Sequence, residues 1–183
     1  MVTMPTQIAL LRAVNVGGTG RIAMAGLRGF FSDLGFGDVR SLLQTGNIVF
    51  EGKPRSGEKL EAFLETEARG RLGLDTIFLI RARHEWEAMI KANPFPEAAR
   101  DDPGHLLVMA LKEAPDARSV AALEEAICGA ERVRALGRHL YIDYPDGIGR
   151  SKLTSVLIEK KLNTRGTARN WNTVQKIAEI ARG

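Results

Sequence analysis

The sequence predicts an α+β protein made of two tandem ferredoxin-like (βαββαβ) subdomains, each an antiparallel sheet with its helices packed on one face. Three observations lead to this prediction. Short apolar runs typical of strands alternate with stretches whose apolar residues recur at three and four positions, as on one face of a helix. These segments follow the order strand, helix, strand, strand, helix, strand, and the order then begins again. The 183 residues also suffice for two small cores of about 80 to 90 residues each.

The first half of the chain contains one complete set of these elements. Gly35 ends the first predicted helix, and Gln44-Thr45-Gly46-Asn47 separates two strands that pair most simply as a hairpin. The apolar spacing predicts strands over residues 7–12, 39–43, 48–50 and 76–80, and helices over residues 24–34 and 60–72.

A connecting segment and a second set of elements follow. A short helix containing Trp86 and Met89 is expected to stop before Asn93-Pro94-Phe95-Pro96, where two prolines favour an extended linker. A turn at Gly137-Arg138 joins two strands of the second set. The spacing predicts strands over 106–111, at Val133, over 140–142 and near Thr167, and helices over 120–127, 153–162 and 174–178. We therefore expect a subdomain at residues 1–83, a connecting helix and linker at 84–103, and a second subdomain with a terminal helix at 104–183.

Composition points to a cytoplasmic protein. Hydrophobic content of 44% and charged content of 26% are typical of globular chains, which disfavours disorder. No apolar run approaches the roughly 18 residues of a membrane-spanning helix, and residues 1–5 lack the basic start and apolar stretch of a secretory signal. The single cysteine, Cys128, cannot form an internal disulfide, as is usual in a reducing compartment.

The predicted topology brings together a first polar cluster. The loop after the first strand and the tip of the hairpin lie at the same end of a βαββαβ unit. Glycine backbone N–H groups near a helix start could hold a phosphate or carboxylate there. Alternatively, the glycines satisfy turns that need a positive φ, and the asparagine beside them tolerates the left-handed region. The candidate residues are Asn15, Gly17, Gly18, Arg21, Thr45, Gly46 and Asn47.

A second cluster joins the loop before the helix at 153–162 to the end of the last strand. Its candidate residues are Ser151, Lys152, Arg169, Asn170 and Trp171, a plausible clamp for an anion. The alternative is structural: Ser151 caps one helix, Asn172 caps the last helix with Gln175 three residues on, and Trp171 belongs to the core.

The distribution of charge and the residue types present limit the ligands that the protein could bind. From Arg150 to Gly183 there are eight Arg or Lys against two Glu, a local net charge of +6, over the segment that carries the second cluster. No dinucleotide fingerprint or P-loop is present, and the three histidines are scattered without metal-ligand spacing, so no cofactor or metal is expected. Aromatic residues are only 6%, which disfavours base stacking on RNA but leaves salt-sensitive binding of a nucleic-acid backbone open.

Four motifs resemble those of a bacterial family catalogued as domain of unknown function 1697. The segments that carry the resemblance are Ala9–Gly18, Gln44–Phe50, Gly149–Leu153 and Thr167–Val174. Family members often carry Ser where this chain has Thr45, and Gly-Ile where it has Ala13-Val14. The resemblance implies tandem ferredoxin-like subdomains, in agreement with the strand order, and it implies no activity.

Three functions remain open at this point. The first is a cytoplasmic binding module for an anionic ligand, which could be a phosphate-bearing small molecule, a nucleotide or a nucleic-acid backbone. The second is an enzyme acting on a small phosphorylated or nucleotide-like substrate, with Lys152 or Asp143 in proton transfer. The third is a structural or protein-interaction module in which the motifs stabilise the fold. The oligomeric state does not follow from the sequence.

Overall fold

The computed structural model describes residues 4–12, 24–43, 45–53 and 57–183. The chain divides into two compact units, and each is described by itself. Unit 1 consists of Met1–Ala88 together with Lys176–Gly183, and unit 2 of Met89–Gln175. The divisions fall within two helices, α3 (Arg83–Lys91) and α7 (Trp171–Arg182).

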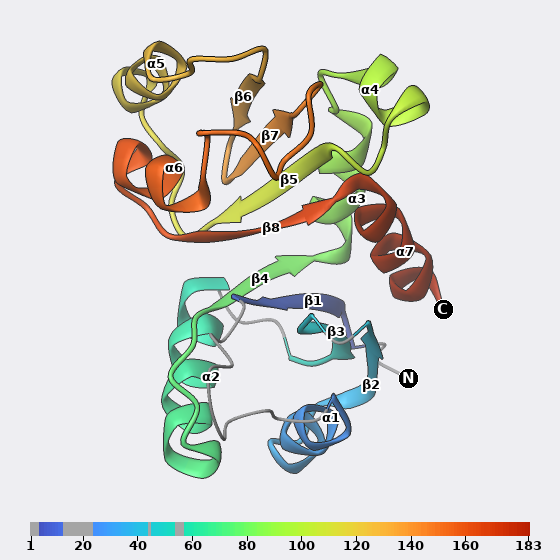
Figure 1. Cartoon of the computed structure of the whole chain (residues 1–183). Helices are drawn as coiled ribbons and strands as arrows, with labels where there is room; N and C mark the ends of the chain where they lie inside the picture. The colour runs from blue at the N-terminus through green and yellow to red at the C-terminus, as the bar shows by residue number, and fades with distance from the viewer. Residues whose placement is uncertain (1–3, 13–23, 44, 54–56) are drawn as a thin grey trace. The chain divides into compact units, whose positions relative to one another are not determined.

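Unit 1 is built on one four-stranded antiparallel sheet with the strand order β2-β3-β1-β4 (Figure 1). Its elements are β1 (Thr6–Leu11), α1 (Met24–Asp33), β2 (Gly37–Leu42), β3 (Asn47–Glu51), α2 (Gly57–Leu72) and β4 (Phe78–Ala82). Alternate residues of β1, such as Ala9 and Leu11, share a core with buried residues of α1 and α2, so both helices cover the same face of the sheet. Phe31 of α1 lies at the centre, with its ring 5.0 Å from that of Phe50 and 6.2 Å from that of Phe78.

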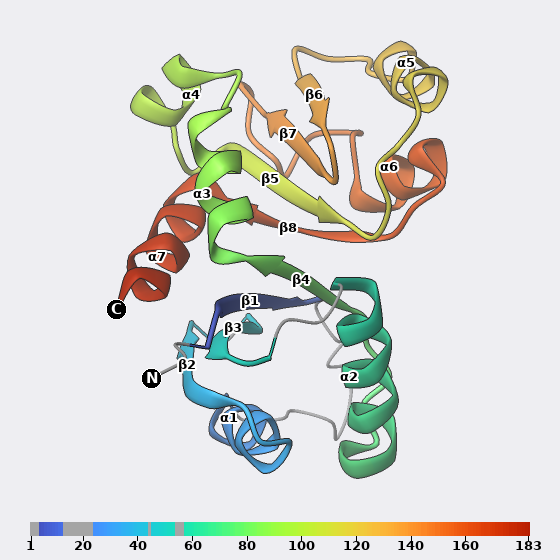
Figure 2. The same ribbon diagram turned by 180° about the vertical axis from the view of Figure 1, so that it is seen from behind.

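Unit 2 repeats the same arrangement. Its sheet has the order β6-β7-β5-β8, again antiparallel throughout (Figure 2). Buried residues of α5 and α6 pack on it around Met109 and Leu140. Its elements are α4 (Pro96–Asp101), β5 (Leu106–Leu111), α5 (Ala117–Glu125), β6 (Arg132–Leu136), β7 (His139–Asp143), α6 (Ser155–Leu162) and β8 (Gly166–Asn170).

The prediction of an α+β fold with two antiparallel sheets is confirmed, but the predicted extended linker is wrong and one predicted strand is shifted along the chain. The segment after Asn93 does not stay extended, because α4 begins at Pro96, and proline at the first position of a helix loses only an N–H that would have no helical partner. The strand predicted over 76–80 is displaced to Phe78–Ala82. Among the described residues, no helix combines the length and the apolar character needed to cross a bilayer.

The free edge of β4 is covered by carboxylates. β4 pairs on one side only, with β1, so alternate N–H groups point away from the sheet. Glutamates accept these bonds: Phe78 N–H to Glu65 at 3.0 Å, Ile80 N–H to Glu61 at 2.8 Å and Ala82 N–H to Glu85 at 2.7 Å. Acceptors of this kind prevent another strand from pairing with the edge.

Candidate functional site

The described part of the first polar cluster is engaged within its own hairpin. Asn47 is only 1% exposed, and its Nδ2 donates to the carbonyl of Leu42 (3.0 Å) and to Oγ1 of Thr45 (2.9 Å). Gly46 has φ +79, and its carbonyl accepts a bond from the N–H of Leu11 (2.8 Å). A Cβ at this glycine would stand 2.8 Å from Cβ of Leu11, so both conformation and space favour glycine.

The other members of the first cluster, Asn15, Gly17, Gly18 and Arg21, lie outside the described residues. Their predicted position beside the hairpin tip therefore stays a prediction.

In the second cluster, Ser151 is bonded to a carboxylate that sequence reasoning did not consider. Its hydroxyl donates to Glu131 and accepts from the N–H of Leu153 (3.0 Å), while Lys152 is exposed. The bond from Ser151 is the main reason that the pKa of Glu131 is lowered from its usual value. Burial and, to a lesser degree, the charge of Glu131 raise the pKa of Tyr144 to about 12. Ser151 therefore belongs to a local polar network of unit 2.

Arg169 and Trp171 are buried. Arg169 is 8% exposed, and its Nη1 donates to Oγ1 of Thr167 (2.9 Å) and to the carbonyl of Ala168 (2.8 Å). Burial lowers the pKa of Arg169 to about 10, which leaves the guanidinium charged at neutral pH. Trp171 is 6% exposed and its backbone N–H donates to the carbonyl of Pro103 (3.2 Å), as expected for a core residue.

Both predicted helix caps are wrong. Thr154, not Ser151, caps α6, because its hydroxyl accepts from the N–H three residues on (3.3 Å). Asn170, not Asn172, caps α7, since its Oδ1 accepts from the N–H of Thr173 (2.9 Å). In each case the helix begins at a residue other than the one that the apolar spacing indicated, and the cap moves with the helix start.

The cap assignment gives a testable difference between two neighbouring asparagines. We expect Asn170→Ala to lower the free energy of unfolding by about 1 kcal/mol, because one N–H of the first turn loses its acceptor. The matched control is Asn172→Ala, which removes an exposed amide. Chemical denaturation of both variants measures the difference, and a larger loss for Asn172→Ala would contradict the assignment.

A pocket of about 550 Å³ opens in unit 1 where β1 and α3 begin. Its lining residues are Pro5, Thr6, Gln7, Ala82, Arg83, His84 and Glu87. Gln7 is 5% exposed, and its Nε2 is buried without a hydrogen-bond partner among the described residues. Arg83 and His84 are the first residues of α3, so the positive end of that helix borders the pocket.

Two arginines pair with the carboxylate of Glu87 beside this pocket. Glu87 accepts from Nε of Arg83 (3.2 Å) and lies 3.5 Å from Nε of Arg182. The hydrogen bond from Arg83 is the main cause that holds the pKa of Glu87 below its usual value, and the charge of Arg182 adds to it. Two guanidinium groups thus face one carboxylate.

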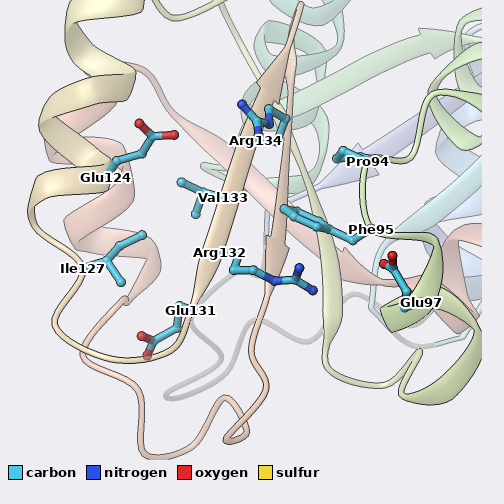
Figure 3. A pocket seen from close by; sticks show the side chains of 9 residues that line it. All are labelled: Pro94, Phe95, Glu97, Glu124, Ile127, Glu131, Arg132, Val133 and Arg134. Atoms are coloured by element: carbon cyan, nitrogen blue, oxygen red, sulfur yellow. The ribbon is translucent and has the colours of Figure 1, made fainter.

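A second pocket, of about 530 Å³, runs along β6 in unit 2 (Figure 3). It is lined by Pro94, Phe95, Glu97, Glu124, Ile127, Glu131, Arg132, Val133 and Arg134. Arg132 donates to Oδ2 of Asp143 from Nε (2.9 Å) and Nη2 (2.7 Å), and its Cζ lies 4.7 Å from the centre of the Phe95 ring. Asp143, proposed above for proton transfer, is therefore held in an ion pair and is 5% exposed.

The residues around both pockets were absent from the sequence-derived candidates. Gln7 offered one signal, because it is a polar residue at the start of a run predicted to be a buried strand. Arg83 and His84 offered none, since a charged pair at a helix start is common on surfaces.

The strand orders define an α+β protein with two four-stranded antiparallel sheets. The chain belongs to the family described as "Protein of unknown function (DUF1697)", whose model matches residues 4–141. That span contains the first two sequence motifs, and the last two lie beyond it. The solved structure of a conserved bacterial protein from Streptococcus pneumoniae is similar, with 22% sequence identity, a TM-score of 0.76 and coverage of 97% of this chain and 99% of that one. No curated protein matches the chain.

Proposed function

We propose that this protein is a binding module for a small anionic ligand, phosphate-bearing or nucleotide-like, and that the ligand lies in the unit 1 pocket where β1 and α3 begin. The observation that carries the proposal is the amide of Gln7. A buried N–H group without an acceptor costs about 1 to 3 kcal/mol, and Gln7 is among the residues that line the pocket, so a ligand oxygen that accepts this bond would recover that cost.

The surroundings of Gln7 suit an anion. The helix start at Arg83 contributes backbone N–H groups and a partial positive charge, which together bind phosphates in many proteins. Arg83 supplies a planar guanidinium, and His84 is exposed at the same helix start. The pocket of about 550 Å³ is in the range of small-molecule sites.

Ligand titrations test the proposal. The probes are inorganic phosphate, pyrophosphate, AMP, ATP and a short single-stranded DNA, each followed by calorimetry and by the thermal unfolding midpoint. We expect at least one phosphate compound to bind, with its Kd raised about tenfold by Gln7→Leu and by Arg83→Ala, because each variant removes donors from the pocket. If no probe binds, the proposal is wrong.

Lys152→Ala is the control for the location of the site. Lys152 is exposed and belongs to the second polar cluster, in the basic segment after Arg150. Binding that survives Lys152→Ala but not Arg83→Ala supports the unit 1 pocket. Binding that survives Arg83→Ala but not Lys152→Ala would indicate that the anion binds at the second cluster. If only the DNA binds, and its affinity falls steeply with salt, the ligand is a nucleic-acid backbone.

A structural role is the second candidate for the sequence motifs themselves. Asn47, Ser151 and Asn170 all hydrogen-bond within their own units, as stabilising residues do. The enzyme alternative has less support, because Asp143 is engaged by Arg132 and Lys152 is exposed.

We further propose that each unit is a ferredoxin-like subdomain. The support is the strand order, β2-β3-β1-β4 and β6-β7-β5-β8, which is the order expected when a βαββαβ chain forms one antiparallel sheet. A cytoplasmic location also remains a proposal, supported by the single cysteine.

A further inference from the structure

The free edges of the two sheets differ in how they are covered. Carboxylates accept bonds from three N–H groups of β4, and in unit 2 Glu159 accepts from the N–H of Gly166 on β8 (3.0 Å). β6 also lies at an edge, since it pairs only with β7. Among the described residues, no side chain covers its outer edge in the same way. This edge is bordered instead by the pocket of about 530 Å³.

The register shows which backbone groups of β6 face outward. The two-residue turn Gly137-Arg138, with φ +55 at the glycine, makes Leu136 and His139 the first hydrogen-bonded pair. Bonded and non-bonded pairs alternate along the hairpin, so the N–H and C=O groups of Val133 and Ala135 point away from β7. These groups have the spacing that an added antiparallel strand requires.

The walls beside β6 form a groove for an extended chain. In Figure 3, Glu124 and Ile127 lie on one side of the strand, and Phe95 and Glu97 lie on the other. Alternate side chains of an added strand would therefore face opposite walls.

The charges of the groove indicate which chain would fit. Arg132 is matched by Asp143 and lies over the Phe95 ring. Three carboxylates then line the groove, those of Glu97, Glu124 and Glu131, against the single guanidinium of Arg134. A second copy of β6 is a poor occupant, because antiparallel pairing would bring two copies of Arg134 close together. The net negative charge favours lysine and arginine side chains.

We propose that the groove along β6 binds an extended basic segment of a partner protein, which adds to the sheet as a fifth strand. The bonds from Val133 and Ala135 hold its backbone, and the glutamates of the walls select its basic side chains. This site lies within unit 2 and is independent of the anion pocket proposed in unit 1.

Labelled hexapeptides test the proposal by fluorescence anisotropy with the full chain. The probes are an alternating Lys-Val peptide, an alternating Glu-Val peptide, and a Lys-Val peptide with proline at its centre. We expect the Lys-Val peptide to bind about tenfold or more tightly than either of the others. Hydrogen exchange should slow at the amides of Val133 and Ala135 in the complex.

Two variants separate backbone pairing from charge. Ala135→Pro removes one outward N–H and is tolerated at an edge, where that N–H has no partner in the sheet; it should weaken the Lys-Val peptide about tenfold. Combined Glu97→Lys and Glu124→Lys substitutions should shift the preference to the Glu-Val peptide without changing the fold. Circular dichroism and thermal unfolding check that both variants are folded.

Several results would overturn the proposal. These are equal affinity for the basic and acidic peptides, no binding of any peptide, no slowing of exchange at β6, or a folded Ala135→Pro protein that binds as before. A dimer in analytical ultracentrifugation that Ala135→Pro dissociates would identify a second copy as the occupant instead.

Discussion

The Glu61→Ala variant is expected to lose about 3 kcal/mol of unfolding free energy, which corresponds to a fall in Tm of about 6 to 12 °C. Glu61 is 2% exposed and accepts from the N–H of Ile80 at 2.8 Å. The same oxygen lies 3.8 Å from Nη1 of Arg81, which is 0% exposed. Removing the carboxylate takes an acceptor from a buried N–H group and a counter-charge from a buried cation, and both losses are costly.

Two further variants separate these contributions. Glu61→Gln keeps an acceptor oxygen but loses the charge, so we expect a smaller loss than for alanine. Lys59→Ala, at an exposed position of the same helix, should change stability by no more than about 0.5 kcal/mol. Calorimetry measures the loss, and hydrogen exchange should show faster exchange at Ile80 than in the unmodified protein. Equal stability of Glu61→Ala and Lys59→Ala would contradict the role assigned to Glu61.

The second large effect is expected at Gly166. This glycine pairs with Leu111 where β8 begins, and a Cβ there would overlap the backbone carbonyl oxygen of Ala110. It would also stand 3.0 Å from Cε of Met109 and Cδ2 of Leu111. Because a backbone oxygen cannot rotate away, β8 must separate from β5, and we expect Gly166→Ala to cost about 2 to 3 kcal/mol.

Gly29→Ala provides a control of opposite sign. Gly29 lies inside α1, and a Cβ there would meet nothing within 4 Å. Alanine should stabilise the helix by about 0.5 to 1 kcal/mol, since it loses less conformational freedom on folding than glycine does. Denaturant unfolding of both variants measures the two effects, and destabilisation by Gly29→Ala as large as that by Gly166→Ala would contradict this account.

The main elements of the fold could be predicted because apolar periodicity depends on which face of an element is buried. The strand at 106–111 and the stripe of α1 are cases in which a single local pattern sufficed. α4 was not predicted because proline disrupts the interior of a helix but is favoured at its first position. The local sequence does not show which of these positions Pro96 occupies.

The candidate sites were harder to predict because their partners are distant in sequence. Ser151 bonds to Glu131, twenty positions away. That the amide of Gln7 has no partner among the residues that the structure describes is recognisable only once the neighbours of β1 are known. The side chains that were most conspicuous in the sequence, such as Asn170, turned out to have short-range bonds of their own. The polar motifs of the sequence therefore predicted helix starts and turns more reliably than they predicted pockets.

The division of the chain into units has a consequence for its synthesis. Unit 2 is one continuous segment, Met89–Gln175, whereas unit 1 combines Met1–Ala88 with Lys176–Gly183. A ribosome therefore releases all of unit 2 before the last part of unit 1, including Arg182 and its contact with Glu87. Unit 2 can reach its native contacts as one continuous stretch of chain, whereas in unit 1 the contact between Glu87 and Arg182 can form only after Lys176–Gly183 has been added.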